Sequence, residues 1–229
     1  TNGGDTWVDI SVNEGLPKGI CGKICMAVSP VNSDRVFAMV ENANGGLFRS
    51  DDAGQTWVKI TEERVIKQRP WYFSGVFADT KNQDIVYVLN VAYHKSTDGG
   101  KTFSTDWAQH ADNHDMWINP DNPNIMIIGN DGGATITFNG GLSWSEQDFP
   151  TGQFYHVAID NRFPYRIYGA QQDNTSISIS SRSFGWEIGR GDWYNCAWGE
   201  SGYIAPHPFK KEVTFGGNYS GAIYRYDRD

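Results

Sequence analysis

The stretch that decides the fold runs from His110 to Pro150 and reads HADNHDMWINPDNPNIMIIGNDGGATITFNGGLSWSEQDFP. It begins with an acidic loop that carries histidines. Three short apolar runs follow, separated by Asn/Pro and Gly-rich segments, and an Asn-Gly-Gly turn then leads to a tryptophan. Short apolar runs bounded by turn-forming residues are typical of β-strands. The stretch therefore predicts one antiparallel sheet, and the rest of the chain repeats its pattern.

Turns of one kind recur along the chain. Each places Ser or Thr, then Asp or Asn, then Gly, before an aromatic residue. Clear copies are SDDAGQTW (50–57), STDGGKTF (96–103) and TFNGGLSW (137–144), with NGGDTW (2–7) at the start and a degenerate copy ending at Trp186. The aromatic residues follow one another at intervals of 50, 46, 41 and 42 residues. This is the period of a four-stranded propeller blade, about 40 to 50 residues.

A second motif keeps the same phase: an apolar strand, an Asn/Asp/Pro turn and another apolar strand, as in AVSPVNSDRVFAMV (27–40). We therefore expect an all-β fold, a β-propeller of four-stranded blades forming a single domain or propeller segment over 1–229. The expected blades are 20–61, 70–107, 112–149, 152–190 and 195–227, the last with an outer strand at 7–11. These make about four complete blades plus parts of a fifth. The parts could close a ring, but we favour an arc of a larger propeller.

Composition excludes some partners. The formal net charge is −8 and there is no basic run, which argues against nucleic acid and anionic membranes. No segment approaches the roughly 18 apolar residues that span a bilayer. Cys21 and Cys25 lie on one expected strand about 13 Å apart, too far for a disulfide. The chain starts at Thr1 without a signal peptide, so we expect a processed protein or a piece of a longer one.

We assign the residues of the repeated turns to folding rather than to chemistry. The Asp or Asn side chain and the Ser or Thr hydroxyl can bond backbone N–H groups within the turn, Gly supplies positive φ, and the aromatic ring fills the gap to the neighbouring sheet. These residues are Ser50, Asp52, Gly54, Trp57, Asp98, Gly100, Phe103, Asn139, Gly141 and Trp144.

The turns resemble the Asp box of BNR repeats, SxDxGxTW, which sialidases, sortilin-type receptors and two-propeller xyloglucanases share. Longer strings are similar to exported bacterial sortilin-like proteins labelled as BNR-repeat glycosyl hydrolases: RPWYF (69–73), DNHD (112–115), GNDGG (129–133), QFYH (153–156) and YGAQQDN (168–174). The resemblance covers essentially the whole chain. It implies a propeller, an extracellular, periplasmic or cell-surface location, and a binding or hydrolytic role.

The loops on the face opposite the repeated turns carry the candidate ligand-binding residues. These are Asp112, His114, Asp115, Asn130, Asp131, Gln171, Gln172, Asp173, Asn174, Asp192, Trp193 and Glu200. Four more tryptophans outside the repeated turns, Trp71, Trp107, Trp117 and Trp198, fall in similar connections. Aromatic faces beside carboxylates and amides suit sugar rings, although the same tryptophans could instead wedge neighbouring blades.

Asp112 to Asp115 together with Asn130 and Asp131 allow three interpretations: a calcium site, a general acid and base for glycoside hydrolysis, or a hydrogen-bonded network that locks loops. We favour the network and expect no resident cofactor. Asp115, Asp131 and Glu200 are the carboxylates to test for catalysis. Only Arg69 and Arg190 sit in suitable loops for an arginine triad, so a sialidase is disfavoured.

The sequence thus favours a binding module for a glycan, a peptide or a protein partner, or for the rest of a larger propeller. The alternative is a glycoside hydrolase acting on a polysaccharide, xyloglucanase-like rather than sialidase-like. The blade count of the parent protein and the identity of the ligand stay open.

Overall fold

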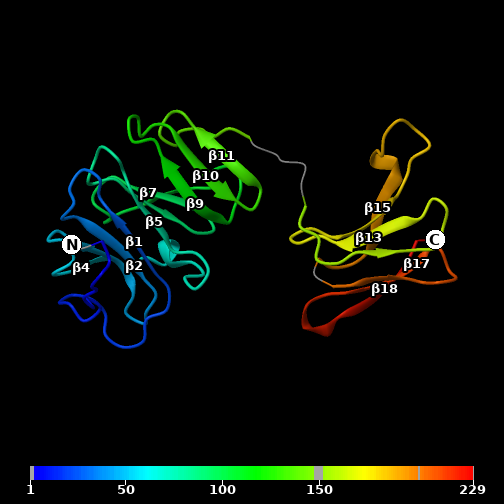
Figure 1. The fold of residues 1–229 in the computed structure, drawn as a ribbon, viewed down its shortest axis with the longest axis horizontal. Helices are drawn as coiled ribbons and strands as arrows, with labels where there is room; N and C mark the ends of the chain where they lie inside the picture. The colour runs from blue at the N-terminus through cyan, green and yellow to red at the C-terminus, as the bar shows by residue number, and fades with distance from the viewer. Residues whose placement is uncertain (1–2, 147–151, 201, 229) are drawn as a thin grey trace. The chain divides into compact units, whose positions relative to one another are not determined.

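The computed structural model describes residues 3–146, 152–200 and 202–228 of an all-β chain (Figure 1). It divides into two compact units, residues 1–149 (unit 1) and residues 150–229 (unit 2). The sheets are antiparallel meanders of up to four strands. This confirms the predicted fold class, an all-β chain built from blade-like four-stranded sheets as in part of a propeller. None of the helices in the described ranges combines the length and apolar character needed to cross a bilayer.

Unit 1 contains three sheets. The first holds β1 (Ile24–Val28), β2 (Val36–Val40), β3 (Gly46–Ser50) and β4 (Val58–Thr61). The second holds β5 (Gly75–Ala78), β6 (Val86–Leu89), β7 (Tyr93–Ser96) and β8 (Ser104–Asp106). The third holds β9 (Asn113–Ile118), β10 (Met126–Asn130) and β11 (Gly133–Thr137). A 3-10 helix, η1 (Arg64–Lys67), precedes β5.

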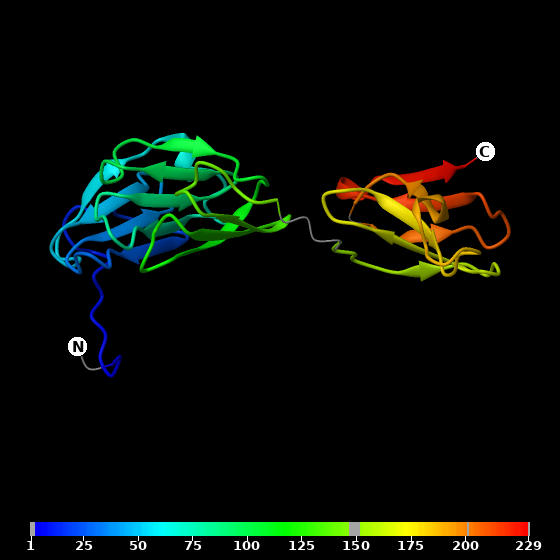
Figure 2. The same cartoon turned by 90° about the horizontal axis from the view of Figure 1, so that it is seen from above.

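The sheets of unit 1 pack face to face (Figure 1 and Figure 2). Side chains alternate between the two faces of a strand, so the continuous apolar run of β6 serves both neighbours. Val86 and Val88 pack toward Phe37 and Leu47 of the first sheet. Tyr87 and Leu89 pack toward the third sheet, where they join the cluster of Tyr93, Met116, Ile118, Met126, Ile128 and Trp144. The innermost strands β1, β5 and β9 are consequently neighbours.

The repeated turns of unit 1 share one hydrogen-bond pattern. In the first copy, the Ser50 hydroxyl donates to Asp52 Oδ1 at 2.7 Å and accepts the Gly54 N–H at 2.8 Å. Asp52 Oδ1 also accepts the Thr56 N–H at 2.8 Å. The copies at 96–102 and 137–143 form the same bonds, with Asn139 in the aspartate position. The Thr56 hydroxyl donates to Asp52 Oδ2 at 2.6 Å, and this bond, with the others to Asp52, lowers the pKa of Asp52 to about 2.

The repeated turns lie at the same end of each sheet as the Asn/Pro turns between the first two strands. The Ala53 N–H donates to the Asp34 carbonyl at 2.8 Å, and Gly99 and Gly140 donate in the same way to Asp84 and Asn124. Lys95 Nζ, just before the second repeated turn, donates to the Gly140 carbonyl of the next sheet at 3.0 Å. The conspicuous polar residues of these turns therefore hold loops and sheets together.

Unit 2 contains two sheets. The first holds β12 (Ala158–Ile159), β13 (Arg166–Ala170), β14 (Ser176–Ser180) and β15 (Trp193–Ala197). The second holds β16 (Ile204–Pro206), β17 (Val213–Gly217) and β18 (Ile223–Asp227). Two 3-10 helices, η2 (Arg190–Asp192) and η3 (Tyr219–Gly221), lie in connections. Tyr168, Ala170, Cys196, Ala197 and Ile204 form the shared core.

Three local predictions differ from the structure. Residues 7–10 form no strand, and Trp7 is 89% exposed. Trp186 is fully exposed, so the degenerate copy does not bury its ring as Trp57 and Trp144 do. Residues 195–197, expected to begin the last blade, instead belong to β15, the fourth strand of the preceding sheet, because β15 pairs with β14. The blade expected at 112–149 ends in residues 147–149, which lie outside the described residues; before them, the Ser145 N–H donates to the Ile136 carbonyl of β11.

Candidate functional site

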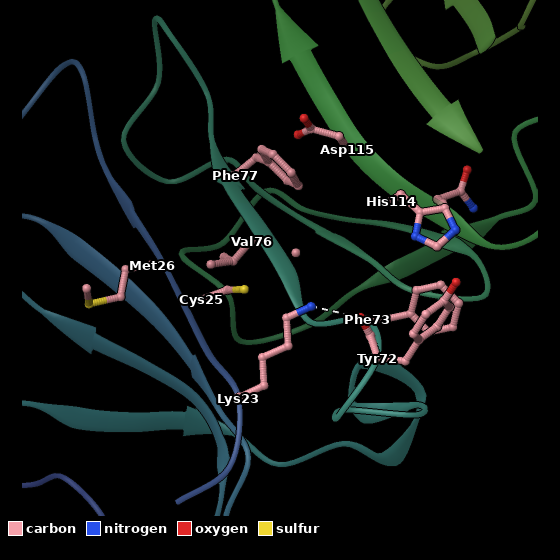
Figure 3. Close-up of a pocket in the computed structure, with 11 residues that line it drawn as sticks. Lys23, Cys25, Met26, Tyr72, Phe73, Val76, Phe77, His114 and Asp115 are labelled. Atoms are coloured by element: carbon pink, nitrogen blue, oxygen red, sulfur yellow. Dashed lines mark hydrogen bonds between the residues drawn. The ribbon is translucent and has the colours of Figure 1, made fainter. Parts of the chain in front are cut away.

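Unit 1 carries a pocket of about 300 Å³ over the innermost strands of its sheets (Figure 3). Its lining comes from Cys25 and Met26 of β1, Val76 and Phe77 of β5, and Asn113, His114 and Asp115 of β9, with Lys23, Tyr72 and Phe73 from the segments before β1 and β5. The side chains converge because β1, β5 and β9 start consecutive sheets and lie side by side. Propellers enclose their central channel with such strands.

The polar residues of β9 and the β10–β11 turn form a connected network. His114 Nε2 lies 2.8 Å from Asp131 Oδ1, and its ring lies 5.4 Å from the rings of both Tyr72 and Phe73. Asn130 Oδ1 accepts the Gly132 N–H at 3.0 Å. These contacts orient His114 and hold the β10–β11 turn in place, as expected if these residues form a hydrogen-bonded network that locks loops.

The loop before β5 is held in an unusual backbone conformation. Arg69 and Ser74 in this loop have φ of 48° and 87°, and Asp112, just before β9, has φ of 57°; this is the left-handed region that non-glycine residues rarely adopt. The Arg69 guanidinium lies 3.7 Å from the Asp112 carboxylate, and its Cζ lies 5.8 Å from the Tyr72 ring centre. Backbone strain of this kind concentrates at functional sites, so this loop belongs with the pocket.

The predicted residues of unit 1 therefore fall in one neighbourhood. Asp115 lines the pocket and its Oδ1 accepts the Met116 N–H at 2.8 Å, whereas Asp131 is engaged by His114. Within residues 3–146, 152–200 and 202–228, no group of three or more His, Cys, Asp or Glu side chains is arranged to hold a metal ion. Calcium at Asp112 to Asp115 stays a sequence-based alternative, and no step is assigned to it.

A second group of polar and aromatic residues gathers on four loops at one end of unit 2; we call it the aromatic loop cluster. Its loops are 152–157, 171–175, 198–200 with 202–203, and 218–222. Glu200 accepts the Asp173 N–H, and the Tyr155 hydroxyl donates to Gln172 Oε1. The loops 152–157 and 171–175 also pair through the Gln172 N–H and the Gln153 carbonyl at 2.9 Å.

Aromatic rings stand out from the cluster. Tyr203 is 70% exposed and stacks on His156, with ring centres 3.7 Å apart and planes 12° from parallel. Tyr155 and Trp198 are exposed as well, and so is Tyr219. The pKa of Tyr219 is raised, first by desolvation and next by the hydrogen bond with Glu200, and the charges of Tyr155 and Asp173 add to the effect. The cluster therefore combines exposed rings with carboxylates and amides.

The structure sorts the predicted residues of unit 2 into two places. Gln171, Gln172, Asp173, Asn174 and Glu200 belong to the aromatic loop cluster. Asp192 and Trp193 do not, because Trp193 pairs with Ile179 and the Asp192 carbonyl accepts a bond from Arg166, at the opposite end of β13 and β14. Placing them with Glu200 was wrong, since β15 is an outer strand of one sheet rather than an inner strand of the next.

Sequence reasoning missed several side chains of both sites. Lys23 lines the unit 1 pocket, and His156, Tyr203 and Tyr219 belong to the aromatic loop cluster. No local signal marks Lys23. The strings RPWYF and QFYH stand out in the sequence, but they give no role to their rings.

Comparisons with known proteins found structural similarity only. No protein-family model and no curated protein matches the chain. The GH74 enzyme of Niastella koreensis is 14% identical with a TM-score of 0.46, and the similarity covers 84% of this chain and 33% of that one. The GH74 xyloglucanase of Xanthomonas campestris is 13% identical with a TM-score of 0.42, covering 89% and 37%.

YCF48 from Cyanidioschyzon merolae is 15% identical with a TM-score of 0.39, covering 92% of this chain and 67% of that one. A further structure, at 12% identity and a TM-score of 0.38, is YCF48 bound to D1 peptide, covering 89% and 64%. The chain spans about a third of the length of the GH74 structures. At these identities and TM-scores the similarities assign neither an activity nor a ligand to this chain.

Proposed function

We propose that this chain is a carbohydrate-binding module whose aromatic loop cluster holds a neutral glycan without hydrolysing it. The carrying observation is the exposure of Tyr155, Tyr203 and Tyr219, at 40, 70 and 59%, around the polar groups of Gln172 and Glu200. Exposed aromatic rings grouped with polar side chains mark binding surfaces. An extracellular, periplasmic or cell-surface setting belongs to the same proposal.

The chemistry of the cluster suits a sugar. The C–H face of a pyranose stacks on a ring such as Tyr203, whose position is already fixed by its stack on His156. Sugar hydroxyls donate to the Glu200 and Asp173 carboxylates and exchange bonds with the Tyr219 hydroxyl. The net charge of −8 disfavours an anionic polysaccharide, so we expect a neutral one.

The candidate carboxylates support binding over turnover. Glycoside hydrolysis needs a protonated and an ionised carboxyl flanking one bond. Glu200 instead accepts the Asp173 N–H, and Asp131 is paired with His114. Asp115 holds the Met116 N–H. Each carboxylate therefore has a protein partner that fixes it, as expected for positioning rather than for proton transfer.

The test is calorimetric titration with six-unit cello-, xylo- and manno-oligosaccharides. We expect one of them to bind, and Tyr203→Ala and Tyr219→Ala each to weaken binding about tenfold, the loss of one stacked ring. Tyr165→Ala is the matched control, since Tyr165 is 45% exposed on the turn before β13, at the other end of that strand.

Two results would contradict the proposal. One is the absence of binding by all three oligosaccharides, or binding that both tyrosine substitutions leave unchanged. The other is release of reducing ends that disappears in Glu200→Gln, which would identify a glycoside hydrolase instead. A peptide or protein partner becomes the better proposal if none of the oligosaccharides binds and the aromatic loop cluster binds neither free nor polymeric sugar.

A further inference from the structure

The segment before β5 carries a second hollow of unit 1, on other residues than the pocket of Figure 3. It is open to solvent, has a volume of about 720 Å³ and is lined by residues of one segment, 64–71. We call it the basic hollow. Its volume lies within the range of ligand-binding pockets. Three features decide what it can hold: cations without a counter-charge, an exposed tryptophan and a fixed backbone beneath both.

The cations of the basic hollow are Arg64, Lys67 and Arg69. Arg64 and Lys67 stand at the two ends of η1, and residues three apart in a 3-10 helix lie on the same face. Among the described residues neither of these two forms an ion pair, and no Asp or Glu lines the hollow. Arg69 shares Asp112 at 3.7 Å, yet its side chain is still 53% exposed. The hollow therefore concentrates positive charge on a chain whose net charge is −8.

The helix η1 is anchored to the core of unit 1, which fixes the two cations that it carries. Ile66 is 1% exposed and belongs to the core cluster of the first two sheets. The Val65 carbonyl accepts a hydrogen bond from Asn90 Nδ2 at 2.9 Å. Lys67 Nζ donates a long bond, 3.4 Å, to the Gly45 carbonyl, which leaves its other N–H groups for a ligand.

Trp71 stands out from a turn that hydrogen bonds close. The Arg69 carbonyl accepts the N–H groups of Tyr72 and Phe73 at 2.9 and 3.0 Å, and Phe73 is buried. Arg69 itself has a φ of 48°, and strained backbone of this kind persists only where its surroundings hold it. Trp71, within this turn, is 69% exposed. A large ring held out on a fixed turn beside cations is placed to contact a ligand rather than the core.

The side chains of the basic hollow select the chemistry of the ligand. A carboxylate pairs with a guanidinium through two parallel N–H bonds and with an ammonium as a point charge. The C–H face of a pyranose stacks on an indole ring, and an amide such as that of Gln68 bonds to sugar hydroxyls. In a uronic acid the carboxylate is attached to the edge of the same ring whose face stacks, so one sugar unit reaches both groups. An acidic peptide leaves the ring unused, and a neutral sugar leaves the cations unpaired.

We propose that the basic hollow binds a chain of uronic acid units, as in an acidic polysaccharide. One unit stacks on Trp71, and the carboxylates of that unit and its neighbour accept from Arg64 and Lys67. The inference goes beyond the proposed function, because it concerns residues of the other unit and an acidic ligand instead of a neutral one. At about 0.1 M salt, charges more than about 10 Å away are largely screened, so the cations nearest to the ligand outweigh the net charge.

The test is calorimetric titration of the whole chain with six-unit oligogalacturonate and with its methyl ester, in which the same sugar chain carries no charge. The acid form is expected to bind with a Kd of about 1 mM or tighter, and the methyl ester at least about tenfold more weakly. Hexaglutamate and a six-unit oligodeoxythymidylate supply negative charge without the sugar acid, and they are expected to bind more weakly to a similar extent. All four probes act on the unaltered protein, so the result does not depend on a variant that folds.

Variants then locate the site. Trp71→Ala is expected to weaken binding of oligogalacturonate about tenfold, the loss of one stacked ring. Arg64→Met and Lys67→Met are each expected to weaken it about threefold, as for one exposed charge pair, and the double variant about tenfold. Trp107→Ala and Lys101→Met are the matched controls and leave binding unchanged, because they alter exposed residues outside the hollow.

The proposal is overturned if oligogalacturonate does not bind, if its methyl ester, hexaglutamate or the oligodeoxythymidylate binds as well as the acid form, or if Trp71→Ala has no effect. Tyr203→Ala, in the aromatic loop cluster, is expected to leave oligogalacturonate binding unchanged, and loss of binding in this variant would also overturn the proposal. The neutral oligosaccharides report on the aromatic loop cluster, so either proposal can fail without the other.

Discussion

His94 makes unit 1 sensitive to acid. Its side chain has no exposed surface, with Nε2 2.9 Å from Asn90 Oδ1 and Nδ1 3.0 Å from Thr105 Oγ1. The Asn90 amide is oriented by its Nδ2, which donates to the Val65 carbonyl at 2.9 Å. Nε2 therefore donates to Asn90 Oδ1, and Nδ1 accepts from the Thr105 hydroxyl. The Thr105 hydroxyl can rotate to accept from a protonated Nδ1, so burial is what disfavours the charged ring.

The magnitude follows from the pKa. Burial lowers the pKa of His94 from 6.5 to about 4. The unfolded chain therefore takes up the proton first as pH falls, so stability is complete above pH 6.5 and declines between pH 6.5 and about 4. The slope approaches 1.4 kcal/mol per pH unit, which gives a loss of about 2 kcal/mol at pH 5 and about 3 kcal/mol in all.

Amide hydrogen exchange of β6 and β7, corrected for the intrinsic effect of pH on exchange, measures this loss locally at pH 7 and pH 5. His94→Gln is expected to be less stable than the wild type at pH 7, because it disturbs a buried network. It should not show the loss of stability toward pH 5 that protonation of His94 causes. His110→Gln, at an exposed histidine, is the control and keeps the full decline. The reasoning is refuted if the wild-type protein loses no more stability between pH 7 and pH 5 than His94→Gln loses.

Two further predictions concern the turns. Gly15→Ala places a Cβ 1.6 Å from the Trp57 carbonyl oxygen at a φ of +91°, whereas Gly19→Ala meets nothing within 4 Å at a φ of +90°. Melting curves should show a loss of about 1 kcal/mol for Gly19→Ala and at least twice that for Gly15→Ala, and equal losses would contradict the steric argument. Asp98→Asn is expected to lower the free energy of unfolding by less than about 1 kcal/mol, because Asn139 makes the same bonds in its own turn. Asp98→Ala loses these bonds and is expected to lower it by about 1 to 2 kcal/mol. Denaturant titration measures both, and equal losses for the two variants would contradict the prediction.

Much of the architecture could be predicted from local signals. The apolar runs at 36–40, 86–89 and 126–130 are strands, and the turns around Asp52, Asp98 and Asn139 close as their residue types suggest. Prediction failed where the period weakened. Between Ser180 and Trp193 the sequence contains a degenerate copy of the turn, but the fourth strand of that sheet, β15, begins only at Trp193.

The candidate site was only partly accessible to the same reasoning. His114, Asp115 and Asp131 were singled out from one short stretch; the structure pairs His114 with Asp131, and His114 and Asp115 both line the unit 1 pocket. Lys23 was not, because nothing in its sequence neighbours shows that the segment before β1 approaches the same space as β9. Asp192 was placed at the wrong end of its sheet for a related reason. How a strand pairs with its neighbours decides at which end of the sheet its first residues lie.

By itself, the sequence determined the strands, the period of the sheets and the chemistry of the repeated turns, since each depends on contacts between residues close in the chain. Only the tertiary structure decided which loops meet: His156 with Tyr203, Asp173 with Glu200, and Lys23 with Tyr72. Such contacts join residues tens of positions apart, and they follow from how sheets stack, which local periodicity does not encode. The stretch from 110 to 150 illustrates both, because its turn at Asn139 can be predicted from local sequence, while the rings of Tyr72 and Phe73 that contact His114 come from the loop before β5.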